Sequence, residues 1–173
     1  MKFAYADPPY IGMANKYPEK EEVDHQELVR YLVAQFSDGW ALSLHTPSLK
    51  QILSYCPDSV RVLAWVKPWA SWRPMTNPVY AWEPVILYGG RKMEVKSDWQ
   101  VRDWLACSTH GSSEKKTGVY GAKPPEFCEW ILDCLGFRNG DEIVDLYPGS
   151  GIMSFTARQL RLEQPGPEQI ELT

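Results

Sequence analysis

Apolar residues follow two alternating patterns along this chain, which together predict strands and helices in turn. Short apolar runs bounded by proline, glycine or polar residues predict strands. These runs cover residues 2–6, 40–44, 60–66, 85–88 and 142–146. Segments with apolar residues three or four positions apart predict helices over residues 24–36, 46–55, 124–135 and 152–160. The alternation indicates an α/β fold in which a mostly parallel sheet carries helices on both faces.

Other local signals mark where these elements begin and end. Asp24 is suited to cap the first predicted helix, and Gly136 to end the third. Residues 11–22 are polar and predict a mobile loop, and residues 91–122 predict irregular structure. Residues 169–172 predict one last strand.

Composition adds the expectation of a single domain outside the membrane. The chain has 173 residues, of which 44% are hydrophobic, and this suits one domain with a substantial core. The sequence contains no run of about 18 apolar residues, so we expect no membrane span. Residues 1–7 lack a signal-peptide pattern. The four cysteines have no paired CxxC spacing. We therefore expect a cytoplasmic protein with reduced thiols, no structural zinc and no membrane partner.

The charge of the chain is unevenly distributed. The net charge of −4 argues weakly against a nucleic-acid partner, but residues 61–123 hold ten Lys and Arg against five Asp and Glu. Six of the eight tryptophans also lie in this basic middle segment. Basic charge interleaved with aromatic rings is typical of a surface that tracks phosphates and stacks on bases. The alternative is a solvated basic face beside a tryptophan-rich core.

A glycine-rich turn follows the strand predicted at residues 142–146. Asp145 stands near the end of that strand, and Gly149-Ser150-Gly151 leads into the next predicted helix. Glycines let the backbone approach a ligand closely, and a helix N-terminus favours an anionic group such as a phosphate or a carboxylate. An acid about 20 residues beyond such a turn commonly holds a ribose hydroxyl, and Glu171 stands there. The alternative is a plain strand–turn–helix.

A second motif, Asp7-Pro8-Pro9-Tyr10, comes directly after the strand predicted at residues 2–6. The Asp7 carboxylate can accept a hydrogen bond from an amino group, and the Pro8 carbonyl is a second acceptor that the prolines hold rigid. Two acceptors on one amine reduce the delocalisation of its lone pair into a base, which favours attack on a sulfonium methyl. Tyr10 offers a ring for stacking on a base removed from its helix. The alternative is a rigid loop with a capping acid.

These motifs together resemble a known family. Residues 7–10 resemble the catalytic signature of amino methyltransferases that act on adenine, and residues 145–151 resemble their cofactor motif. Residues 121–124 resemble the third cofactor-binding segment, and residues 82–92 resemble the strand and turn that follow the catalytic half. The catalytic motif comes first and the cofactor motif last. This order is similar to the permuted, beta-type arrangement of bacterial and phage DNA methyltransferases.

The resemblance implies a Rossmann-like methyltransferase sandwich that uses S-adenosylmethionine (SAM) to methylate the exocyclic amino group of adenine in DNA. It divides a single domain into a catalytic half (residues 1–90), a short recognition region (91–120) and a cofactor-binding half (121–173). Because the recognition region is short, we expect target recognition to need a homodimer or a partner subunit, or to be loose. Direct methyl transfer needs alignment of the two reactants and neither a covalent nucleophile nor a metal.

The expected site residues form three groups. The expected catalytic residues are Asp7, Pro8, Pro9 and Tyr10. The expected cofactor-binding residues are Asp7, Lys123, Pro124, Asp145, Tyr147, Gly149, Ser150, Gly151 and Glu171. The expected nucleic-acid-binding residues, all from the basic middle segment, are Lys67, Trp69, Arg91, Lys92, Lys115 and Lys116.

The chain also departs from the family pattern. The family usually has Asp-Pro-Phe before its Gly-x-Gly turn, where this chain has Asp145-Leu146-Tyr147-Pro148, and the sequence stops at Thr173, before the usual helix and strand beyond the ribose acid. Two alternatives therefore stay open. The mRNA adenosine methyltransferase family shares the permuted order, but it prefers Asp-Pro-Pro-Trp and lacks the glycine-rich turn. The other alternative is an inactive methyltransferase fold that binds nucleic acid or protein.

Overall fold

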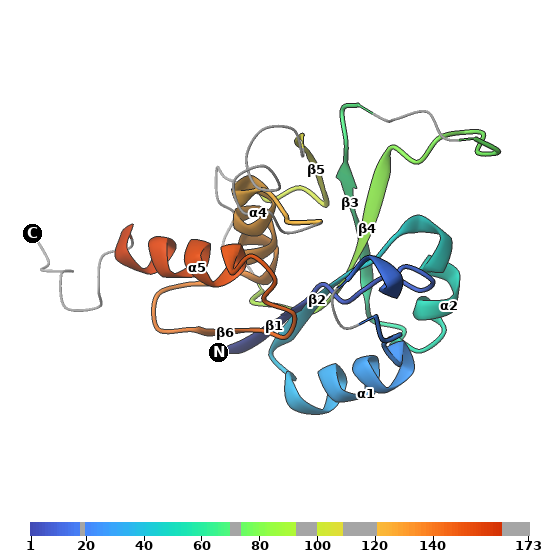
Figure 1. The fold of residues 1–173 in the computed structure, drawn as a ribbon. Helices are drawn as coiled ribbons and strands as arrows, with labels where there is room; N and C mark the ends of the chain where they lie inside the picture. Colours follow the sequence, from blue (N-terminus) through green and yellow to red (C-terminus); the bar gives the residue numbers. More distant parts are fainter. Residues whose placement is uncertain (18–19, 70–73, 93–99, 109–120, 164–173) are drawn as a thin grey trace, which may run out of the picture.

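A six-stranded sheet with helices on both sides forms the centre of the protein (Figure 1). The computed structural model describes residues 1–17, 20–69, 74–92, 100–108 and 121–163. The strands are β1 (Lys2–Ala6), β2 (Gly39–Ser43), β3 (Arg61–Val66), β4 (Trp82–Gly89), β5 (Trp104–Ala106) and β6 (Glu142–Asp145), in the spatial order β5-β3-β4-β2-β1-β6. The α-helices are α1 (His25–Gln35), α2 (Leu49–Leu53), α4 (Pro125–Leu135) and α5 (Ile152–Glu163).

The predicted α/β class is confirmed, and the sheet is mostly parallel. Within the described residues, five strands run in one direction and only β4 runs against its neighbours, β2 and β3. The structure adds strand β5, which the sequence did not predict. This strand has three residues and only one of them is partly buried, so it carries no readable apolar pattern.

Strand β1 lies between β2 and β6 and is parallel to both. Its register pairs Tyr5 with Asp145 of β6, so the carboxyl ends of the two strands lie side by side. After β1 the chain crosses to α1 on one face of the sheet, and after β6 it turns to α5 on the other face. This divergence creates the crevice in which α/β sheets commonly bind ligands.

Both faces of the sheet are covered by apolar side chains. Phe3 and Tyr5 of β1 pack with α4 and α5, whereas Ala4 and Ala6 pack with α1 and α2. The alternation follows from the two-residue period of a strand. Trp65 of β3 is 2% exposed in the core beneath α4, so for this tryptophan the core alternative is correct.

The predicted helix boundaries are close to the observed ones. Asp24 caps α1 by accepting a hydrogen bond from the Glu27 amide at 3.0 Å, and Gly136 ends α4 with φ of 67°. The helix predicted over residues 46–55 is instead a 3-10 turn, Thr46–Ser48, followed by α2. The strand predicted at residues 169–172 lies outside the described residues. None of the described helices is both long and apolar enough to span a membrane.

Candidate active site

A cavity of about 720 Å³ opens where the carboxyl ends of β1 and β6 meet. Its walls come from the segment after β1, the segment before α4, the turn between β6 and α5, and residues 17 and 21–23. A cavity of this volume suits a small-molecule ligand.

The structure brings most of the sequence-predicted cofactor residues to this cavity. The residues of that group that line it are Asp7, Lys123, Asp145, Tyr147, Gly149 and Ser150. Pro124 is instead the N-cap of α4, and Gly151 closes the turn by donating its amide hydrogen to the Pro148 carbonyl at 2.6 Å. Glu171 lies outside the described residues.

Asp145 supplies a carboxylate to the wall of the cavity. Burial, reinforced by the nearby charge of Asp7, raises the pKa of Asp145 to about 6, although the Tyr147 amide donates a hydrogen bond to it at 3.3 Å. A carboxylate in this position can pair with a cationic ligand.

Lys123 forms a two-pronged ion pair with Asp7. Its ammonium nitrogen lies 2.7 Å from Oδ1 and 2.6 Å from Oδ2, across 116 residues of sequence. The Lys123 side chain is 7% exposed and that of Asp7 is 20% exposed. Burial raises the pKa of Asp7 against the lowering effect of Lys123. Burial by itself would lower the pKa of Lys123, but Asp7 and Glu83 together hold this pKa above its ordinary value.

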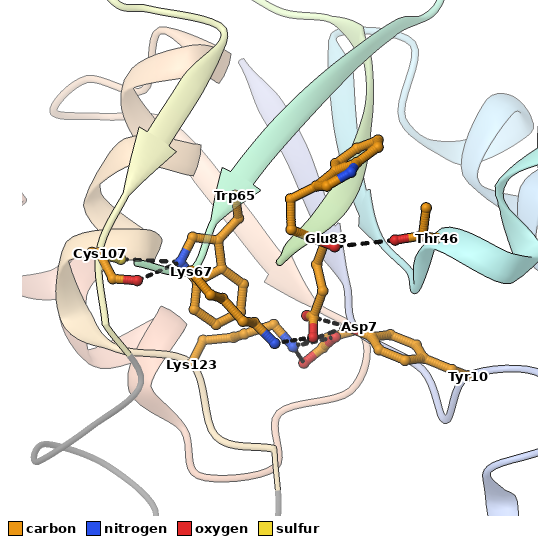
Figure 2. A network of polar contacts seen from close by, with 9 residues as sticks. Asp7, Tyr10, Thr46, Trp65, Lys67, Glu83, Cys107 and Lys123 are labelled. Atoms are coloured by element: carbon orange, nitrogen blue, oxygen red, sulfur yellow. Dashed lines mark hydrogen bonds and ion pairs between the residues drawn. The ribbon is translucent and has the colours of Figure 1, made fainter. Parts of the chain in front are cut away.

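Glu83 extends this pair into a network that also includes Tyr10 and Lys67 (Figure 2). The Tyr10 hydroxyl donates to Glu83 Oε2 at 3.0 Å, and the Lys67 ammonium contacts Oε1 of the same carboxylate. Burial would raise the pKa of Glu83, but Lys123 and Lys67 outweigh it and hold this pKa below its usual range. The network therefore balances two carboxylates against two ammonium groups.

Sequence reasoning missed Glu83 as a site residue. A parallel sheet binds ligands at the carboxyl ends of its strands, so site residues are expected after strands and not at their beginnings. Because β4 is antiparallel, its first residues lie at the same sheet edge as the carboxyl end of β3, where Glu83 pairs with Trp65. The sequence carried no signal for the direction of β4.

A second missed group comes from the segment predicted as a mobile loop. Tyr17, Glu21 and Glu22 of this segment line the cavity, as does Val23 directly after it. The segment has no hydrophobic period, so nothing in its sequence marks these side chains as part of a site.

The ring of Tyr10 is held in a defined plane. It stacks on the imidazole of His45, with ring centroids 5.3 Å apart and an angle of 10° between the planes. The hydroxyl is held by Glu83 at the same time. The ring and the hydroxyl are therefore fixed by different neighbours.

The expected nucleic-acid residues that the structure describes do not form one surface. Lys67 lies in the network beside Asp7, and Trp69 follows β3 with 63% of its surface exposed. Arg91 lies elsewhere, because its Nη2 atom contacts the two carboxylate oxygens of Asp141 at 2.9 and 2.7 Å, just before β6 begins. This is the end of the sheet opposite Asp7, so the grouping of Arg91 with the site is corrected.

Three further residues complete the expected nucleic-acid-binding group. Lys92 is exposed and follows Arg91, whereas Lys115 and Lys116 lie outside the described residues.

Known structures share this fold. The chain is similar to the crystal structure of the M1.HpyAVI–SAM complex, with 17% sequence identity and a TM-score of 0.60, over 92% of this chain and 78% of that one. A second crystal structure of M1.HpyAVI gives 13% identity and a TM-score of 0.60, over 92% of this chain and 76% of that one. No protein-family model and no curated protein matches the sequence. The likeness therefore shows the fold.

Proposed function

We propose that this protein transfers a methyl group from SAM to the exocyclic amino group of adenine in DNA. The observation that carries the proposal is the adjacency of Asp7 and Asp145 on one cavity wall, at the ends of paired parallel strands. Asp7 belongs to the motif that resembles the amino-methyltransferase signature, and Asp145 leads into the glycine-rich turn.

The side chains around the cavity fit SAM. Asp7, Glu21, Glu22 and Asp145 are acidic, which suits the positive sulfonium and ammonium groups of this cofactor. The N-terminus of α5 borders the same cavity through Ile152 and offers backbone N–H groups to the cofactor's carboxylate. M1.HpyAVI, which has a similar fold, is described in complex with SAM.

The chain's own residues would position the target amine. When bound, SAM supplies an electrophilic methyl group. Asp7 accepts a hydrogen bond from the amine and orients its lone pair toward the cavity, with the Pro8 carbonyl as the second acceptor. The nitrogen–carbon bond forms as the carbon–sulfur bond breaks, and the surplus amine proton leaves along the hydrogen bond to Asp7. Alignment at about 3–3.5 Å supplies much of the rate enhancement.

A cysteine nucleophile does not fit this site. Cys128 lines the cavity, but burial raises the pKa of its thiol well above the ordinary value. The thiolate needed for attack is therefore scarce at neutral pH. This supports direct transfer to an amine and argues against the covalent route used for cytosine carbon 5.

Two measurements test the proposal. Calorimetry should give a micromolar dissociation constant for SAM, about −8 kcal/mol. Incubation with SAM and mixed-sequence DNA or RNA, followed by digestion to nucleosides and mass spectrometry, should yield N6-methyladenine from DNA. Methylation of RNA alone would favour the RNA adenosine alternative. SAM binding without any methylated nucleoside would favour an inactive binding subunit.

A further inference from the structure

We propose that Lys123 is a placeholder for the target amine: its ammonium occupies the acceptor site on Asp7, and the incoming base displaces it toward Glu83. This inference rests on the proposed function and adds a residue whose movement couples target binding to the catalytic motif.

The first argument is competition for the same oxygens. The Lys123 ammonium lies 2.7 and 2.6 Å from the two oxygens of Asp7, and both distances are those of full charge-assisted hydrogen bonds. A target amine also needs one of these oxygens as its acceptor. An ammonium and an amino group are both N–H donors, so Lys123 presents to Asp7 the same chemistry as the substrate.

The second argument is that an alternative acceptor lies within reach. Lys123 Nζ is 3.4 Å from the Tyr10 hydroxyl, which is itself 3.0 Å from Glu83 Oε2. Lys67 contacts the other Glu83 oxygen, Oε1. A swing of the flexible lysine stem past the Tyr10 hydroxyl would therefore move the ammonium from one half-buried carboxylate to another.

Three aromatic rings lie around the Lys123 ammonium. The Lys123 ammonium lies 5.6 Å from the ring centroid of Tyr10, 5.9 Å from that of Trp65 and 6.0 Å from that of Phe127. Ring faces attract a cation at these distances and do not fix its direction. They stabilise the ammonium beside Asp7 without adding a directional contact that would hold it there.

The third argument concerns the charge of Asp7. The target amine is neutral, so it cannot replace the positive charge that keeps this buried carboxylate ionised. The charged and titratable groups around Lys123 are Asp7 after β1, Tyr10 and Tyr17 in the following segment, Glu83 on β4 and Cys128 on α4, with Lys67 on the far side of Glu83. Among these, Lys123 is the cation in contact with Asp7. It must therefore leave the acceptor oxygens but stay nearby.

Nuclear magnetic resonance of the wild-type protein tests the displacement directly. With the protein labelled with 15N-lysine and saturated with S-adenosylhomocysteine, millimolar adenosine should shift the Lys123 Nζ resonance and leave that of Lys50, exposed on α2, in place. In Glu83→Gln the second carboxylate is lost, so the same adenosine addition should shift the resonance less. A Lys123 resonance that adenosine leaves unchanged would overturn the proposal.

The pH profile of methyl transfer gives an independent test. In Lys123→Met, Asp7 loses its cation, so the acidic limb of the rate profile should move up by about one pH unit or more. The variant's deficit relative to wild type should then shrink about tenfold from the foot of the acidic limb to the plateau above it, whereas Lys50→Met should follow wild type throughout. An equal deficit at every pH would mean that Lys123 binds the substrate directly and would refute the placeholder role. If wild-type protein methylates nothing, the proposed function fails, while the adenosine experiment still decides the displacement.

Discussion

Tyr10 and Glu83 are 73 positions apart in the sequence, yet the Tyr10 hydroxyl donates a 3.0 Å hydrogen bond to the Glu83 carboxylate. The contact joins the last residue of the Asp7-Pro8-Pro9-Tyr10 motif to the antiparallel strand β4. Together with the stack on His45, it fixes the orientation of the ring before any base arrives. Tyr10 therefore has two separable properties, an aromatic face and an anchored hydroxyl.

Substitution of Tyr10 should separate these two properties. Tyr10→Phe keeps the ring and removes one hydrogen bond. The activation free energy for turnover on DNA should therefore rise by about 1 kcal/mol. Tyr10→Ala also removes the stacking face and should cost about 1–3 kcal/mol more. Steady-state kinetics measure both variants, with SAM affinity as the control. Equal losses in the two variants would show that the ring face contributes nothing.

Asp7 is the residue on which the proposed chemistry depends. Asp7→Ala removes the acceptor of the amine, so methyl transfer should fall at least ~100-fold, comparable to the loss of one positioned transition-state contact. SAM affinity should stay within a few-fold of wild type, because Asp145 and the glycine-rich turn remain. Calorimetry and nucleoside mass spectrometry measure the two quantities. Wild-type turnover in Asp7→Ala would exclude the mechanism.

More of the fold than of the site could be predicted from the sequence. Strands β1 and β6 are five- and four-residue segments of largely apolar sequence that end at distinctive motifs, so their positions followed from the sequence pattern. The direction of β4 could not be predicted, because apolar alternation is the same in both directions. Because this direction was unknown, Glu83 was not predicted as a site residue.

Side-chain contacts between residues far apart in the sequence could also not be predicted. Lys123 was expected at the cofactor site on resemblance, but its contact with Asp7 depends on how the segment before α4 crosses the end of β1. Arg91 was grouped with the nucleic-acid residues on charge alone, and charge does not report which acid lies nearby. In both cases the sequence gives the charge of the side chain but not the acidic residue that it contacts.

Asp145 should make SAM binding depend on pH. Because burial raises its pKa to about 6, the carboxylate is ionised above that pH and neutral below it. SAM affinity should therefore be full above pH 7 and fall by up to about tenfold per pH unit below pH 6. Asp145→Asn should bind SAM weakly with little pH dependence between 5 and 7. A wild-type affinity that is constant over this range would contradict the assignment.

Asp145→Asn, which should weaken SAM binding, should make the unliganded protein more stable. An acid whose pKa is raised in the folded state is stabilising when protonated, and this contribution is lost as the pH rises from about 4 to about 6. At pH 7, Asp145→Asn should therefore increase the free energy of unfolding of the unliganded protein by about 1 kcal/mol, less than the full pKa shift corresponds to because solvent screens this partly exposed group. Urea unfolding with and without SAM measures the gain in stability and the loss of binding in one series.

Arg91 should matter for stability and not for nucleic acid. Its guanidinium contacts Asp141, which is 5% exposed, lies just before β6 and also accepts a hydrogen bond from the Arg138 amide at 2.9 Å. The N-terminal ammonium of Met1 also contacts Asp141 Oδ1, at 2.7 Å, so this carboxylate keeps one cation when Arg91 is removed. Arg91→Ala should therefore lower the free energy of unfolding by about 1 kcal/mol, the loss of its charged hydrogen bonds. Lys92→Ala, on the exposed neighbour, is the matched control and should change stability by less than about 0.5 kcal/mol.

Salt dependence of DNA binding then distinguishes the two roles, because each phosphate contact adds about 0.9 to the slope of log affinity against log salt concentration. Arg91→Ala should leave this slope unchanged, since its guanidinium lies at the end of the sheet opposite Asp7. The double variant Lys115→Ala and Lys116→Ala, by contrast, should reduce the slope by about 1–2 and leave the free energy of unfolding close to wild type. A reduced slope in Arg91→Ala with unchanged stability would mean that Arg91 leaves Asp141 to bind phosphate, and would return it to the nucleic-acid surface.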